Sequence, residues 1–263
     1  MQRLAACQQA GAVGGVPIGA PLGNGLGFLL RQVLELHCRV HILLMQDVGA
    51  RMRIGVPLAR LLGLGVTKAS GDLRALPAAR EEIQNVVATG SARRMVGESY
   101  FDDEFTAQRL KNASDGHFQV VHIASHFRFS PGTEANSYLL LGNDQRLTLG
   151  ALRQQNYRFD NVDLLTLSAC DTGLGGGYNA EGQEIEGFGV IAQEQGAHAV
   201  LATLWQVNDR STSLFMQSMY RSRSAQSLDK AAALRSAQLA LLAMPQYRHP
   251  YYWAPFVLMG NWR

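Results

Sequence analysis

The chain has 263 residues, of which 47% are hydrophobic and 17% are charged. This composition is that of a globular protein, so it excludes disorder over the whole length, and the length suffices for one large domain or two small ones. The formal charge is only +3, and no Lys/Arg run of the kind that grips phosphate occurs, which argues against binding to nucleic acid.

The first part of the chain differs from the rest. Seven glycines and two prolines lie between residues 11 and 27, a density that disfavours both helix and strand. We therefore expect residues 1–60 to be a weakly structured N-terminal extension or the remnant of an upstream region. Residues 61–263 are expected to form the functional domain.

The cellular location is predicted from the apolar stretches, the N-terminus and the cysteines. The longest apolar stretch, Leu26 to Met45, contains Arg, Glu and His side chains and is a poor membrane span. The N-terminus is also a poor signal peptide. The three cysteines, Cys7, Cys38 and Cys170, match no disulfide or metal framework. A cytoplasmic protein without contact to a membrane is predicted.

From residue 61 onward, short apolar runs alternate with segments of helical spacing. Strands are predicted over residues 61–67, 119–126, 137–142, 164–170, 198–205 and 256–262. Helices are predicted from Pro77, from the acidic pair before Phe105, and over residues 184–195, 209–220 and 228–242. This alternation indicates an α/β fold whose mainly parallel sheet is covered by helices on both faces. Functional residues gather beyond the C-terminal strand ends of such sheets.

Two predicted strands end in a reactive side chain, His126 and Cys170. If the strands are parallel, both residues lie at the same edge of the sheet. An imidazole beside a thiol can take its proton and later protonate a leaving amine. A glycine-rich loop, residues 173–177, follows and would leave backbone N–H groups for an oxyanion. From the residues alone, a small buried cysteine and a structural histidine explain the pattern equally well.

His122 lies four residues before His126 and would share its strand face, inside the sheet. We expect it to be a packed core histidine or one that supports the site. A zinc hydrolase built from His122, His126 and Cys170 is a further alternative. The helical zinc motif would need Glu after the first histidine, whereas Ile123 follows here and fits a strand, so we expect neither a metal nor another cofactor.

Four segments in order carry a resemblance to a known family. They are residues 122–126 (HIASH), 167–175 (LSACDTGLG), 202–209 (ATLWQVND) and 249–262 (HPYYWAPFVLMGNW). Together they resemble the CHAT domain, a family related to caspases and separases, and the similarity spans roughly residues 61–263.

The resemblance implies a caspase-like three-layer α/β/α sandwich and a cysteine endopeptidase with a His–Cys dyad. It implies that His126 is the general base and Cys170 the nucleophile. The backbone N–H groups of Phe127 and Cys170 would form the oxyanion hole, and Asp171 would be either a residue of the substrate pocket or one that caps the loop.

Two departures from the family pattern stand out. The family usually has glycine after the catalytic histidine, where this chain has Phe127, whose Cβ restricts φ and could misalign the oxyanion hole. Family members also commonly carry tetratricopeptide repeats upstream, and we recognise no such repeat in this sequence.

The sequence therefore predicts a cysteine endopeptidase that acts on a protein or peptide substrate. A regulatory protein or an upstream repeat module would activate it. Acidic residues close to the nucleophile in sequence, Asp171, Glu181, Glu184 and Glu186, would favour a basic side chain before the scissile bond. The alternative is a catalytically inactive CHAT-like module for protein interaction.

Overall fold

The computed structural model describes residues 59–88, 95–115, 118–128, 130, 134–155, 157–168, 183–205, 207–226 and 228–263. All of them belong to one compact unit, Arg53–Arg263. The predicted extension, residues 1–60, lies outside the described residues except for its last two positions. Within the described ranges, no helix combines the length and apolar character that crossing a membrane requires.

The described part of the chain contains a seven-stranded sheet in the order β10-β9-β8-β4-β1-β3-β2. All neighbouring strands are parallel except β10, which runs antiparallel to β9. The strands are β1 (Leu61–Gly65), β2 (Val87–Ala88), β3 (Met95–Phe101), β4 (Val120–Ala124), β8 (Leu164–Ser168), β9 (Ala199–Thr203) and β10 (Phe256–Gly260). Five of them are predicted by the sequence, whereas β2 and β3 are not.

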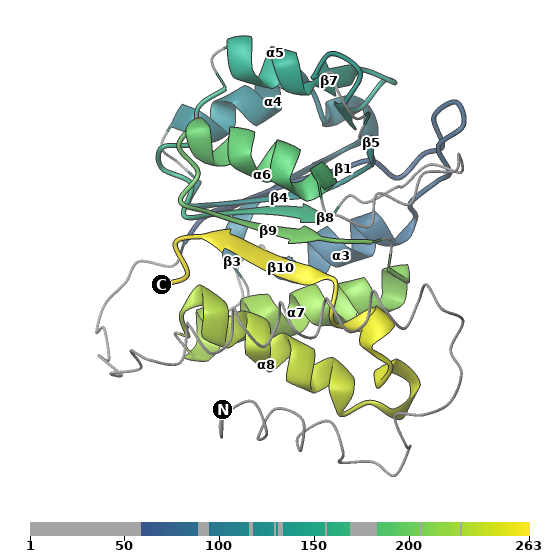
Figure 1. Cartoon of the computed structure of the whole chain (residues 1–263), viewed down its shortest axis with the longest axis vertical. Coiled ribbons are helices and arrows are strands. Elements are labelled where there is room, and N and C mark those ends of the chain that lie inside the picture. Colours follow the sequence, from purple (N-terminus) through teal and green to yellow (C-terminus); the bar gives the residue numbers. More distant parts are fainter. Residues whose placement is uncertain are drawn as a thin grey trace. The chain divides into compact units, whose positions relative to one another are not determined.

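Helices cover both faces of this sheet (Figure 1). One face carries α3 (Ala78–Val86), α7 (Asp209–Gln226) and α8 (Lys230–Leu242). The other carries α4 (Ala107–Lys111), α5 (Leu149–Gln154) and α6 (Gln183–Glu194). Strand residues alternate between the two faces, as the twofold period of a strand requires. Val120 packs against the α3, α7 and α8 side, and Val121 packs against the α4, α5 and α6 side. The predicted α/β/α sandwich is confirmed.

A small antiparallel sheet in the order β5-β6-β7 branches off where β4 ends. Its strands are β5 (Phe127–Arg128), β6 (Tyr138–Leu140) and β7 (Arg146–Thr148). The sequence predicts residues 137–142 as a strand of the main sheet, and that placement is wrong. The backbone N–H of Leu140 instead donates to the carbonyl of His126 over 2.8 Å, so β6 pairs with the segment that follows β4.

The helix predicted from the acidic pair Asp102–Asp103 also begins elsewhere. A short 3₁₀ turn, η2 (Asp102–Glu104), follows β3, and α4 starts only at Ala107. Thr106 provides the cap, since its hydroxyl accepts the N–H of Arg109 over 3.2 Å. The Asp102 side chain is directed instead to the loop after β1, where it binds Thr67. Three further 3₁₀ turns are η3 (Asn112–Asp115), η4 (Pro245–Tyr247) and η5 (Pro250–Tyr252).

Candidate active site

The two strands that lead to the predicted dyad are parallel neighbours that end level with each other. Ala124, the last residue of β4, is in register with Ser168, the last residue of β8. The pairing continues one step further, because the N–H of Ser125 donates to the carbonyl of Ser168 over 3.3 Å. His126 follows β4 by two positions, and Cys170 follows β8 by two positions. Cys170 and Asp171 themselves lie outside the described residues.

A backbone carbonyl contacts the ring of His126. Its Nε2 lies 2.8 Å from the carbonyl oxygen of Arg74, and the residue is 1% exposed. A carbonyl can only accept, so Nε2 donates this bond and carries a proton. In the neutral form of the ring, the basic lone pair is then on Nδ1. The contact therefore fixes both the tautomer and the orientation of the ring.

Arg74 belongs to the 67–76 loop, which joins β1 to α3 and which we define as Thr67 to Leu76. The loop is closed at its base, where the N–H of Leu76 donates to the carbonyl of Thr67 over 3.1 Å. An ion pair between Asp72 and Arg128 connects the loop to β5. The hydrogen bond from Arg128 is also the main reason that the pKa of Asp72 lies below its ordinary value. The carbonyl that contacts His126 is thus part of a braced loop.

Phe127 occupies an ordinary strand conformation. The described non-glycine residues with positive φ are Asp102, Asn143 and Asp144, so the Cβ of Phe127 causes no strain here. Its ring is buried and meets Phe188 edge to face, with ring centroids 5.5 Å apart. The misalignment expected from a side chain at this position is therefore not seen in its backbone.

The N–H of Phe127 also points away from β6. Phe127 is opposite Leu139, and the bond from Leu140 to His126 makes this a non-hydrogen-bonded antiparallel pair. In such a pair, the N–H and C=O groups are directed away from the partner strand. The amide that the sequence assigns to the oxyanion hole is therefore not used in the β5–β6 ladder.

His122 is a fully buried core histidine, as the sequence predicts. Its Nε2 lies 2.8 Å from Oε1 of Glu82, and its Nδ1 lies 3.0 Å from the hydroxyl of Tyr220. Because both ring nitrogens have protein partners, a metal would have to displace one of them. Within the described ranges, no group of three His, Cys, Asp or Glu side chains could hold a metal ion.

Two groups at this edge of the sheet are not predicted from the sequence. The carbonyl of Arg74 leaves no trace in the sequence, because every residue has one. Asp102 is visible in the sequence as part of an acidic pair before an apolar run, but such a pair also marks the start of a helix, which is what we predict from it. The same residues fit an acid that directly follows a strand, at the edge of the sheet where functional residues gather.

Comparison with known proteins agrees with the motifs. The sequence matches the family model described as the CHAT domain over residues 4–261. Among solved structures, the chain is similar to the Arg-specific cysteine proteinase gingipain R (RGPB), with 10% identity and a TM-score of 0.47. That likeness covers 78% of this chain and 46% of the gingipain chain, so this chain spans less than half of that structure. No curated protein matches the sequence.

The family match reaches almost from one end of the chain to the other. It includes most of residues 1–60, so the domain boundary predicted at residue 61 stays a prediction. The match confirms the resemblance that the four motifs carry, and the chain has the mainly parallel α/β sheet that this resemblance implies. The chain belongs to the CHAT domain family.

Proposed function

We propose that this chain is a cysteine endopeptidase of the caspase-like class. His126 takes the proton of Cys170, and the thiolate attacks the scissile carbonyl of a protein or peptide substrate. His126 then protonates the leaving amine, and water releases the acyl-enzyme. The observation that carries this proposal is the register of β4 and β8, whose last residues, Ala124 and Ser168, each precede one dyad member by two positions.

The surroundings of His126 support the role of general base. With Nε2 donating to the carbonyl of Arg74, the lone pair of Nδ1 is the one that accepts the thiol proton. The same carbonyl stabilises the imidazolium that forms, since it faces the N–H that becomes more acidic. The N–H groups of Phe127 and Cys170 would bind the oxyanion. For Phe127, this is supported by an amide that points out of the β5–β6 ladder.

Substrate choice and activation are parts of the same proposal. Asp171 and Glu181 follow the nucleophile closely in sequence, and Glu184 and Glu186 lie in the first turns of α6. Their charge favours a substrate with a basic side chain before the scissile bond. Because His126 is 1% exposed, a regulatory protein or a repeat module would act by opening the site to a polypeptide substrate, while the pairing of Cys170 with His126 is already present in the isolated chain.

The burial of His126 also favours a second candidate function. A base that substrate cannot reach would make the chain a non-catalytic module that keeps the fold for protein interaction. The two functions differ in the reactivity of Cys170, because pairing with a base raises the thiolate fraction of a thiol at neutral pH.

Alkylation with iodoacetamide, followed by peptide mass spectrometry, tests the proposal. We expect Cys170 to react roughly tenfold or more faster than Cys7 and Cys38 at pH 7, because a neighbouring imidazole raises its thiolate fraction. The advantage should be lost in His126→Gln, and the rate should reach its plateau near neutral pH. The three rates measured in denaturant serve as the control. Equal rates for the three cysteines in the native chain would contradict the peptidase and support the interaction module.

A further inference from the structure

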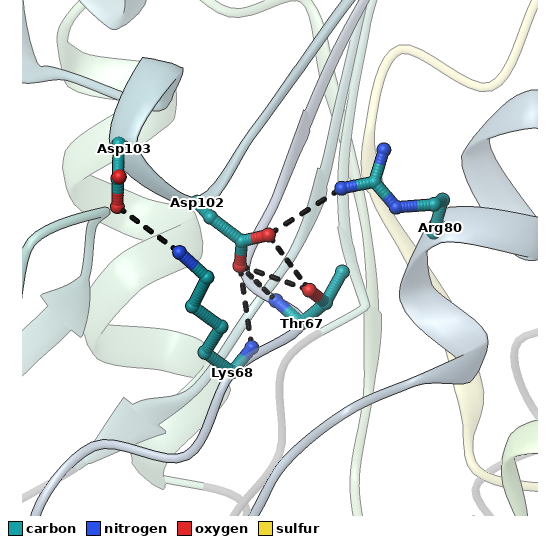
Figure 2. A network of polar contacts seen from close by, with 5 residues as sticks. All are labelled: Thr67, Lys68, Arg80, Asp102 and Asp103. Carbon is teal, nitrogen blue, oxygen red and sulfur yellow. Dashed lines mark hydrogen bonds and ion pairs between the residues drawn. The ribbon is translucent and has the colours of Figure 1, made fainter.

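Asp102 has an unusual backbone and an unusually complete set of partners. It follows β3 directly, and its φ of 50° lies in the left-handed region that residues with a Cβ avoid. Its carboxylate accepts the backbone N–H of Thr67 over 2.7 Å, the hydroxyl of Thr67 over 2.7 Å and the N–H of Lys68 over 3.2 Å (Figure 2). Arg80 adds an ion pair at 3.4 Å. A disfavoured conformation is kept here because several contacts hold it.

These contacts are concentrated on one end of the 67–76 loop. Thr67 begins the loop, and its carbonyl accepts the N–H of Leu76, which ends it. The position of Thr67 therefore constrains that of Leu76 and of Arg74, which precedes Leu76 by two positions. The Arg74 carbonyl in turn holds Nε2 of His126 over 2.8 Å. A continuous path of hydrogen bonds and backbone thus leads from the Asp102 carboxylate through Thr67, Leu76 and Arg74 to the imidazole.

Arg80 fixes the carboxylate from the other side. Its guanidinium lies 4.1 Å from the ring centroid of Phe101, the residue before Asp102, while it also pairs with the carboxylate (Figure 2). Burial opposes the charge of Asp102, but the hydrogen bonds from Thr67 and Lys68 outweigh it, so the pKa of Asp102 lies below its ordinary value. Asp102 is thus a permanent anion at neutral pH, and the N–H groups at the base of the loop face it.

We propose that Asp102 is a positioning residue for the catalytic histidine: it anchors the base of the 67–76 loop, so that the Arg74 carbonyl keeps the His126 ring in its tautomer and orientation. Asp102 does not touch the reacting atoms. The inference rests on the proposed function, since orienting His126 matters for catalysis only if His126 is the base.

The experiment follows the ring proton of His126 in the full chain. The Nε2 proton, buried and bound to the Arg74 carbonyl, is expected to give a proton NMR signal that disappears in His126→Gln. We expect Asp102→Ala to speed its exchange with water roughly tenfold or more, because the loop loses its anchor. The Cys170 alkylation rate should fall by a similar factor, since misplacing a catalytic group lowers the rate steeply.

Two further variants separate positioning from folding. Asp102→Asn keeps an oxygen for the Thr67 and Lys68 amides but loses the ion pair with Arg80, so an intermediate exchange rate is expected even if Asp102→Ala fails to fold. Asp103→Asn is the matched control. Asp103 is the next residue, it is exposed, and it pairs only with the Lys68 side chain over 3.4 Å among the described contacts. Its signal and alkylation rate should equal those of the wild type.

The outcomes distinguish this inference from the proposed function. An unchanged His126 signal in both folded Asp102 variants would overturn the positioning role, whatever the activity. A changed signal in a chain whose Cys170 reacts no faster than Cys7 would support the positioning role and overturn the peptidase. An effect of Asp103→Asn as large as that of Asp102→Asn would show that local charge, and not the anchor, is responsible, and would overturn the inference.

Discussion

Glu82→Ala is expected to lower the free energy of unfolding by about 3 kcal/mol. Glu82 lies on α3, is 4% exposed, and accepts from Nε2 of His122 over 2.8 Å. His122 has no exposed surface, so the substitution leaves a buried N–H without its acceptor. The Tyr220 hydroxyl, 2.7 Å from Thr166, completes a chain of polar groups that links α3 and α7 to β4 and β8 on one face of the sheet. Breaking one link removes partners from a network that water cannot reach.

Glu81→Ala provides the matched control for this experiment. Glu81 is the preceding residue of the same helix and is exposed, so its substitution should change the free energy by no more than about 0.5 kcal/mol. Glu82→Gln keeps an accepting oxygen and should cost only about 1 kcal/mol. Urea unfolding followed by circular dichroism measures all three. Equal losses for Glu81→Ala and Glu82→Ala would show that the buried network contributes nothing to stability.

Local sequence predicts those strands that are buried on both faces. Residues 120–124, for example, are buried throughout and are apolar except for His122, because helices cover both sides of the sheet. β3 escapes prediction for the opposite reason. Its residues 97–100 are partly exposed and include Glu98 and Ser99, so it lacks the apolar run of a central strand. Burial, and not strand formation itself, is what the pattern detects.

Strand pairing is less visible in the sequence than strand formation. The apolar residues of β6 resemble those of β8, yet β6 pairs in the small sheet. The difference arises from the partner segment after β4, which lies more than ten positions away in the chain. No local period of hydrophobicity encodes such a choice.

The candidate site, too, contains features that the local sequence predicts and features that depend on the folded chain. His126 can be predicted because it is a side chain with chemistry at the end of an apolar strand. Its partner is a main-chain carbonyl 52 positions earlier in the sequence, and the position of that carbonyl depends on how the 67–76 loop closes. Asp102 has a side-chain signal, but its role depends on the left-handed turn after β3, which appears only in the folded backbone.

Asp163→Ala is expected to lower the free energy of unfolding by about 3–5 kcal/mol at neutral pH, because it leaves a buried charge without its counterion. The ammonium of Lys230, on the first residue of α8, has no exposed surface and lies 2.5 Å from Asp163. Arg223 pairs with the same carboxylate over 2.9 Å. Removing Asp163 therefore leaves two cations close together, one of them out of reach of water.

The response to pH identifies the cause of this loss. Burial lowers the pKa of Lys230 more than the bond to Asp163 raises it. The unfolded chain therefore binds more protons than the folded chain between the two pKa values, and stability rises with pH across that window. Asp163→Ala lowers the folded pKa of Lys230 further, which widens the window downward. The variant should regain part of its lost stability between pH 7 and about pH 9.

Adding Lys230→Met to Asp163→Ala removes the charge along with its partner, and this double variant should recover most of the loss, because an apolar side chain of similar length fills the site. It should also lose the alkaline gain, since no buried ammonium remains to release a proton. Asp160→Ala is the control, because Asp160 is half-exposed and pairs with Arg158 on the surface, so its loss should change stability far less than the loss of Asp163. Urea unfolding at both pH values measures each variant. A double variant as unstable as Asp163→Ala would mean that the carboxylate stabilises the fold through Arg223 and not through the buried lysine.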